Sequence, residues 1–185
     1  MKKIVIAAII STVTSSAYAV DTAHTSQATA SWYGTANIIP SDAHTITGKG
    51  GIMKLEDGTL NLQADGTFTS TPIVMESHKL DTTITGSVQD QVAEKVATDW
   101  NLETASFDWG VVNTATANEI LANLVFMDEL SGKELTLDGT KIVDGAEGIN
   151  VSVSNSVVPK SQPVNPAEEA HVEATFVSTY ITSTP

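Results

Sequence analysis

The chain has 185 residues, a net charge of −13 and no cysteine. Its nine cationic side chains are all lysines, and such an acidic, arginine-free composition argues against binding nucleic acid or an anionic membrane surface. Without cysteine there are neither disulfides nor thiolate metal sites, so stability must come from packing and backbone hydrogen bonds.

Residues 1–19 have the pattern of an export signal. Two lysines precede the apolar run 4–10, and segment 17–19 (Ala-Tyr-Ala) fits a small-residue cleavage site. The run is shorter than the roughly 20 apolar residues that a membrane-spanning helix needs. We therefore expect cleavage before Val20. The exported chain, not inserted in a membrane, would be two charges more acidic than the full sequence and of a size that suits one domain.

Residues 27–36 alternate at period two, which is typical of a strand with one buried face. We predict that one set of side chains faces the core: Ala28, Ala30, Trp32, Gly34 and Ala36. The other set faces water or a neighbour: Thr29, Ser31, Tyr33 and Thr35.

Short apolar runs follow, separated by acidic-glycine pairs. Glycine accepts the positive φ of tight turns, so each pair predicts a turn between paired strands. The oxygen series of a calcium-binding EF-hand is missing around all four, which favours ordinary turns. The pairs are Asp57-Gly58, Asp65-Gly66, Asp138-Gly139 and Asp144-Gly145. The predicted strands are 52–55, 60–64, 67–71, 73–76, 80–88, 135–137, 142–143, 149–153 and 171–181.

Two segments have helical spacing of their apolar residues. Residues 89–97 predict one short helix. Residues 116–130 predict another, although a buried strand over 121–127 fits nearly as well. Three prolines in 158–166 predict a loop. Many short strands with frequent turns predict an all-β, immunoglobulin-like antiparallel β-sandwich with one or two short helices.

The sequence contains no motif that predicts a catalytic, cofactor or metal site. The four histidines, His24, His44, His78 and His171, are far apart in sequence, so we expect surface or edge-strand positions for them. Trp100 and Trp109 flank an acidic stretch. They could line a sugar-binding patch, but we expect them to anchor a loop over the core.

The two ends of the expected mature chain resemble a known family. Residues 26–36, with small alternating side chains around Trp32, are similar to the opening strand of common-pilus (Mat-type) major pilins of the alternate chaperone–usher class. Residues 172–180 resemble the closing strand of that family, a V-x-x-x-F-x-x-T-aromatic pattern. The resemblance covers about twenty residues, together with the chain length and the absence of cysteine.

This resemblance implies a structural subunit of a surface fimbria and no enzyme. Its sandwich, residues 34–185, would be incomplete, and the extension 20–33 of the next identical subunit would fill its groove by strand addition. The donor residues would be Ala28, Ala30 and Trp32. The groove residues on the closing strand would be Val172, Ala174, Phe176 and Tyr180.

The implied partners are identical subunits, a periplasmic chaperone and an outer-membrane usher. The implied route runs through the periplasm to a cell-surface fimbria for adhesion and biofilm formation, with a host or abiotic surface as its target. Two alternatives remain open from the sequence. One is a monomeric secreted adhesin or carbohydrate-binding module that uses the Trp100–Trp109 region. The other is an exported hydrolase with an unrecognised site.

Overall fold

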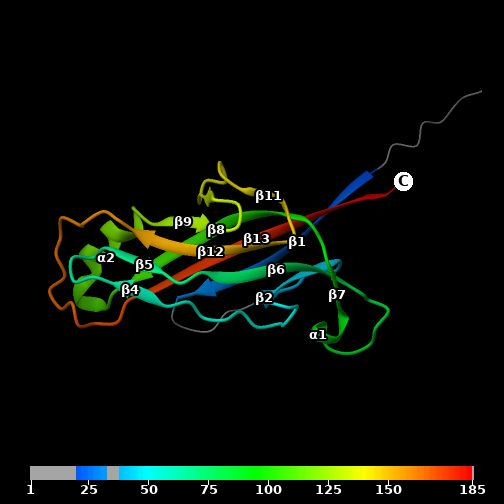
Figure 1. Cartoon of the computed structure of the whole chain (residues 1–185), viewed down its shortest axis with the longest axis horizontal. Helices are drawn as coiled ribbons and strands as arrows, with labels where there is room; N and C mark the ends of the chain where they lie inside the picture. Colours follow the sequence, from blue (N-terminus) through cyan, green and yellow to red (C-terminus); the bar gives the residue numbers. More distant parts are fainter. Residues whose placement is uncertain (1–19, 33–37, 185) are drawn as a thin grey trace, which may run out of the picture.

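A computed structural model describes residues 20–32 and 38–184 of the chain (Figure 1). The export signal expected at 1–19 and the predicted strand positions 33–36 lie outside the described residues. Within the described residues, no helix is both long and apolar enough to cross a bilayer.

The first sheet has five strands, and all of its pairings are antiparallel. The two longest, β13 and β1, lie next to each other, and both carry extended period-two alternation of side chains. In order across the sheet the strands are β11 (Val143–Ala146), β8 (Thr98–Asp108), β13 (His171–Thr184), β1 (Val20–Ser31) and β2 (Ile38–Ile39).

The second sheet has eight strands, also antiparallel, with β12 at its centre. Its main path is β10 (Lys133–Leu135), β9 (Val125–Asp128), β12 (Gly148–Asn155), β5 (Phe68–Ser70) and β4 (Leu60–Leu62). Strand β6 (Ile73–Leu80) also pairs with β12 and carries β3 (His44–Thr47) and β7 (Val92–Lys95).

Aromatic side chains from the two sheets meet in the core. Phe68 of β5 stacks on Phe107 of β8, with ring centroids 5.6 Å apart. Phe126 of β9 meets Phe176 of β13 edge-on at 6.2 Å. All four side chains are buried. Two antiparallel sheets that bury their facing sides against each other form a β-sandwich, which confirms the predicted fold class.

The helical segments are short: α1 (Val88–Gln91), η1 (Val111–Asn113) and α2 (Thr114–Leu121). The competing predictions for 116–130 are each right in part, because α2 is followed by β9. The helix predicted over 89–97 is wrong beyond Gln91. Residues 92–95 pair with β6 instead, so sheet pairing overrides their helical spacing.

Two predicted strands are wrong. Residues 52–55 form no strand; Gly48 N and Lys54 N both bond to the carbonyl of Ile52 in a turn. Residues 81–87 form no strand either. The Asp81 carboxylate accepts hydrogen bonds from the amide and hydroxyl of Thr83, and this local turn ends β6 at Leu80.

Of the four acidic-glycine pairs, only Asp65-Gly66 closes a hairpin between paired strands, β4 and β5. Asp138-Gly139 turns the chain from one sheet to the other. Asp144-Gly145 lies within β11, where the register shifts and Gly145 has φ 60°, a bulge rather than a turn. Asp57-Gly58 precedes β4, but residues 48–56 directly before the pair form no strand for it to join. The predicted turns are thus right at Asp65-Gly66 and Asp138-Gly139 and wrong at the other two pairs, and only one of the four joins two paired strands.

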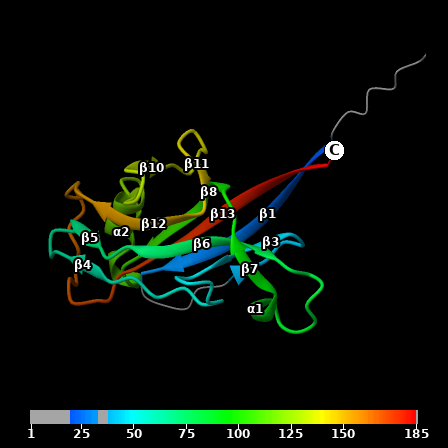
Figure 2. The same ribbon diagram turned by 45° about the vertical axis from the view of Figure 1, so that its right-hand side comes forward.

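Strands β1 and β13 continue together beyond the rest of the sandwich as a two-stranded arm (Figures 1 and 2). Strand β8 pairs with β13 only as far as Thr179, whereas β1 pairs with it as far as Thr184. Helix α2, η1 and the 156–170 loop lie at the opposite end of the molecule.

Candidate functional site

The pairing of β1 with β13 unites the two segments that carry the family resemblance. The antiparallel register runs without a break from Val20 opposite Thr184 to Ser31 opposite Glu173. One hydrogen bond continues it, from Trp32 N to the Val172 carbonyl at 3.0 Å. The described part of the predicted donor segment therefore lies against the predicted closing strand, within the same chain.

Strand β13 presents one face to the core. Val172, Ala174, Phe176 and Ser178 are buried, and the residues between them are exposed or half-buried. Tyr180 is half-buried at the base of the arm, with its ring edge-on to His44 at 5.9 Å. The predicted groove residues thus follow each other along one side of one strand, as period-two alternation requires.

Strand β1 contributes to the same core. Ala28 is fully buried in register between Phe176 of β13 and Ile38 of β2. Ala30 is aligned with Ala174, and its side chain lies outside the described residues. Ser26, which we did not predict, is also buried. Its hydroxyl donates to the His44 carbonyl at 2.8 Å and accepts from Ser41 N at 3.3 Å.

Trp32 is the large anchor at the end of β1. Its side chain is 1% exposed, and its ring lies 6.1 Å from that of Phe126. Its Nε1 donates to the Thr71 carbonyl at 2.8 Å. Gly58 passes so close that an added Cβ would lie 2.2 Å from Cδ1 of the indole. Position 58 therefore requires glycine because the indole leaves no room for a side chain, and not because of the backbone angles of Gly58.

The other edge of β1 is held much less firmly. Only Gln27 and Ala28 pair with β2, and Gly58 N adds one bond to the Ser31 carbonyl. One ladder, the one with β13, therefore supplies most of the main-chain pairing of β1. If β1 left, β13 would present a long unpaired edge.

A buried polar cluster joins β1, β3 and β13, and we did not predict it. His44 lies on β3, which pairs only with β6 among the described strands and is thus an edge strand as expected, but its side chain is fully buried. Its Nε2 donates toward the carbonyl of Ser178 at 3.2 Å, and Ser178 Oγ bonds to Thr98 at 2.8 Å. All four residues of β3 are buried, so this strand lacks the alternation that would have signalled it.

This cluster predicts acid sensitivity. Burial lowers the pKa of His44 from 6.5 to about 4, although the bond with Ser178 opposes the shift. Between those values the unfolded chain binds a proton that the folded chain does not. The free energy of unfolding should therefore fall as the pH drops from about 6.5 to about 4, by about 3 kcal/mol in total.

Urea unfolding at pH 7, 5.5 and 4.5 measures this loss. The His44→Gln variant should be less stable at pH 7. Its free energy of unfolding should change much less between pH 6.5 and 4.5 than that of the parent chain. Equal slopes in the two proteins would assign the acid sensitivity to other groups.

His78 is also buried, and β6 is paired on both sides at this residue, so the expected surface or edge-strand position is wrong. It shares the Glu76 carboxylate with Lys95, at 3.2 and 2.7 Å. Burial opposes ionisation of Glu76, but hydrogen bonds from Lys95, His78 and Gly50 N bring its pKa below the ordinary value. Among residues 20–32 and 38–184, no three His, Asp or Glu side chains are placed to hold a metal ion together.

Trp100 and Trp109 are fully buried, so the sugar-binding patch proposed for them is wrong. The stretch between them is strand β8, not a loop. Each indole does act as an anchor: Trp100 Nε1 donates to the Ala146 carbonyl at 3.0 Å, and Trp109 Nε1 to that of Glu168 at 2.9 Å.

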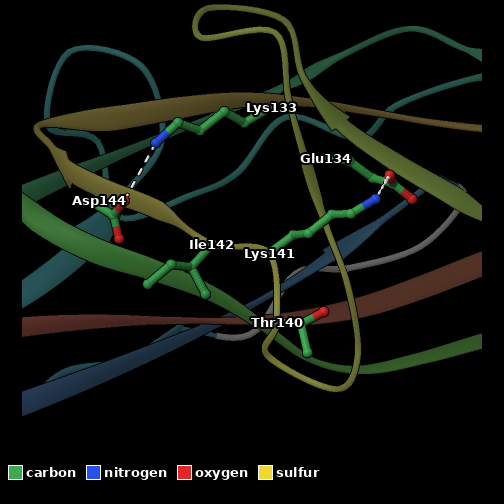
Figure 3. A pocket seen from close by; sticks show the side chains of 6 residues that line it. All are labelled: Lys133, Glu134, Thr140, Lys141, Ile142 and Asp144. Carbon is green, nitrogen blue, oxygen red and sulfur yellow. Dashed lines mark hydrogen bonds and ion pairs between the residues drawn. The ribbon is translucent and has the colours of Figure 1, made fainter.

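A hollow of about 280 Å³ lies between the β10 and β11 segments (Figure 3). Its charged side chains are already paired, Lys133 with Asp144 at 3.3 Å and Lys141 with Glu134. These pairs leave the hollow without an uncompensated charge to recognise a ligand, and we assign no function to it.

Comparison with known proteins identified no relative. No protein-family model matches the chain, and neither does any curated protein or solved structure. The β1–β13 pair is therefore the candidate site on its geometry and on the resemblance of its two strands alone.

Proposed function

We propose that the chain is a structural subunit of a surface fibre, and that β1 of one copy takes the β1 position in the next. The observation that carries the proposal is the unbroken ladder between β1 and β13, together with the burial of Ala28 and Trp32 beside it. Such a fimbria, similar to those of the common-pilus pilins, would serve adhesion and biofilm formation.

The ladder makes β1 suitable for exchange between copies. Main-chain hydrogen bonds give affinity to an added strand, and buried side chains at alternate positions give its register. A neighbour's β1 would make the same bonds to β13 in the same antiparallel direction. Because β2 holds β1 at only two residues, the main-chain pairing that exchange must replace is almost entirely the ladder with β13.

Within a single chain, β1 competes with the neighbour's strand. Five residues separate Trp32 from Ile38, and a strand tethered by so short a segment has an effective concentration on the order of millimolar. A free subunit therefore closes on its own β1 before a neighbour arrives. Assembly then needs a factor that occupies β13 until exchange, which is the role proposed for a periplasmic chaperone and an outer-membrane usher.

The test begins with deletion of residues 20–32 from the mature chain. We expect the shortened chain to form no fibres and to bind a synthetic peptide of residues 20–32, with a rise in its melting temperature. Electron microscopy and gel filtration measure assembly, and thermal unfolding measures peptide capture. Fibres formed without these residues would contradict the proposal.

A second variant moves the strand within the chain instead of deleting it. Because Val20 lies opposite Thr184, residues 20–32 joined after Thr184 by a short Asn-Gly turn can fold back along β13 in the native register. This variant, without its N-terminal copy, should be a stable monomer that neither donates nor accepts a strand. If it assembles like the parent chain, β1 is not the link between copies.

Expression on cells separates the fibre from a monomeric secreted module. Cells that export the parent chain with its assembly factors should carry filaments, and cells with the strand-moved variant should not. A parent chain that stays monomeric both on these cells and in solution would favour the secreted module.

A further inference from the structure

Two neighbouring segments at the end of the body opposite the arm, η1 and the 156–170 loop, expose three valines. Val111 and Val112 of η1 are 91% and 56% exposed, and Val164 is 75% exposed. The side chain of Asn113 holds them in place, since its Oδ1 accepts from Val164 N at 3.0 Å and its Nδ2 donates to the Asn165 carbonyl at 2.9 Å. We call Val111, Val112 and Val164 the valine patch.

Strand β1 ends at the same end of the molecule. Trp32 bonds to Val172 near the start of β13, and its side chain lines a hollow with Glu169 and Ala170. The 156–170 loop, which contains Val164, leads into β13, and η1 follows the end of β8 in the chain. The loop lies at this end of the body (Figure 2).

Chain length limits where a donating copy can sit. Six steps along the chain join Trp32 to Ile38, and they span at most about 20 Å when fully extended. A copy whose Trp32 occupies its neighbour's β1 position must therefore keep its own Ile38 within about 20 Å of that point. A body so close must lie against the end of the neighbour from which the strand emerges.

We infer that the valine patch is the surface on which the body of the next copy of this chain sits in the fibre, an inference that rests on the proposed strand exchange. The entering body begins with Ile38 and Ile39, and Ile39 is itself 53% exposed. Contact between apolar side chains on both copies removes them from water, which favours association. The patch thereby adds a body-to-body contact to the strand-to-groove contact.

The test compares two double variants of the full mature chain, refolded at high concentration so that strands can exchange between copies. Val111→Asp with Val164→Asp places two charges in the patch. The control, Leu130→Asp with Leu137→Asp, adds the same charge to side chains that are 71% and 52% exposed elsewhere on the body. Thermal unfolding should give each double variant a melting temperature close to that of the parent, since these side chains are exposed.

We expect the patch variant to give only short oligomers, with polymer yield reduced roughly tenfold, because charge in the centre of an interface opposes its desolvation. The control should polymerise like the parent. A patch variant that polymerises like the control would overturn the inference and leave strand exchange intact. A parent chain that polymerises neither on refolding at high concentration nor when exported with its assembly factors would overturn the proposed function, and the inference with it.

The absence of cysteine allows a second measurement on polymers. A single Val111→Cys variant should react with a thiol reagent roughly tenfold more slowly in polymer than in monomer, because the interface excludes water. Leu137→Cys should react equally in both. Equal rates at position 111 would also overturn the inference.

Discussion

Replacing Ala28 with aspartate is expected to destabilise the folded chain by about 3 kcal/mol or more, because the new carboxylate would be buried without a partner. Ala28 is 0% exposed and faces the core between β13 and β2. Urea unfolding at pH 7 measures the loss. In a fibre the same carboxylate would enter the neighbour's groove, so a peptide of residues 20–32 with this change should fail to bind the shortened chain.

The matched control is Thr25→Asp on the opposite face of the same strand. Thr25 is exposed, so its replacement should cost about 1 kcal/mol or less. The corresponding peptide should bind nearly as well as the unmodified one. Equal effects at positions 25 and 28 would mean that the alternation of β1 does not determine its pairing.

Replacing Trp32 with alanine is expected to cost about 3–5 kcal/mol, the range for removal of a buried aromatic side chain. The variant loses the packing on Phe126 and leaves the Thr71 carbonyl without the indole donor. Chemical unfolding measures the loss, and a variant as stable as the parent would contradict the burial of this side chain.

A double-mutant cycle with Gly58 tests the fit around the indole. Gly58→Ala alone should destabilise the chain, because its Cβ would approach Cδ1 of Trp32 to 2.2 Å. In the Trp32→Ala background the same change should cost far less, since the clashing atoms are gone. The two effects should therefore be strongly non-additive, and simple additivity would show that the two residues do not touch.

The same Trp32→Ala change also tells how the anchor is used. A variant that unfolds as a monomer shows that Trp32 completes the fold of its own chain. A variant that folds but does not assemble shows that the anchor acts mainly in the neighbour. Binding of two peptides to the shortened chain separates the two roles. One peptide has the native residues 20–32 and the other carries Trp32→Ala, so only the donated strand differs.

The strands with the clearest alternation were predictable from sequence. Along β13, Val172, Ala174 and Phe176 repeat at period two, and the buried face follows directly from the pleat of a strand. The pattern around Ala28 and Trp32 indicated the core side of β1 in the same way. Many such segments in one chain without cysteine also predicted the antiparallel sandwich.

Side-chain pattern alone was insufficient where contacts across the fold determine local structure. Val92 to Lys95 have helical spacing, but they form β7 because β6 offers them a partner. Asp65-Gly66 and Asp144-Gly145 are nearly the same in sequence, yet one closes a hairpin and the other is a bulge within a strand. His44 gave no signal of burial, because β3 is covered on both faces and does not alternate.

The sequence by itself indicated the buried face of β13 and the burial of Ala28 and Trp32 in β1, since these follow from the two-residue period of a strand. It was wrong for Ser31, which it placed on the opposite face and which is 1% exposed. Only the tertiary structure decided that these two strands, about 150 positions apart in the chain, lie against each other, with Val20 opposite Thr184. It also decided that the buried polar cluster around His44 joins β3 to these two strands, and that Gly58 lies against the indole of Trp32. Pairing and register between distant strands arise from the packing of the whole sandwich, and no local pattern encodes them.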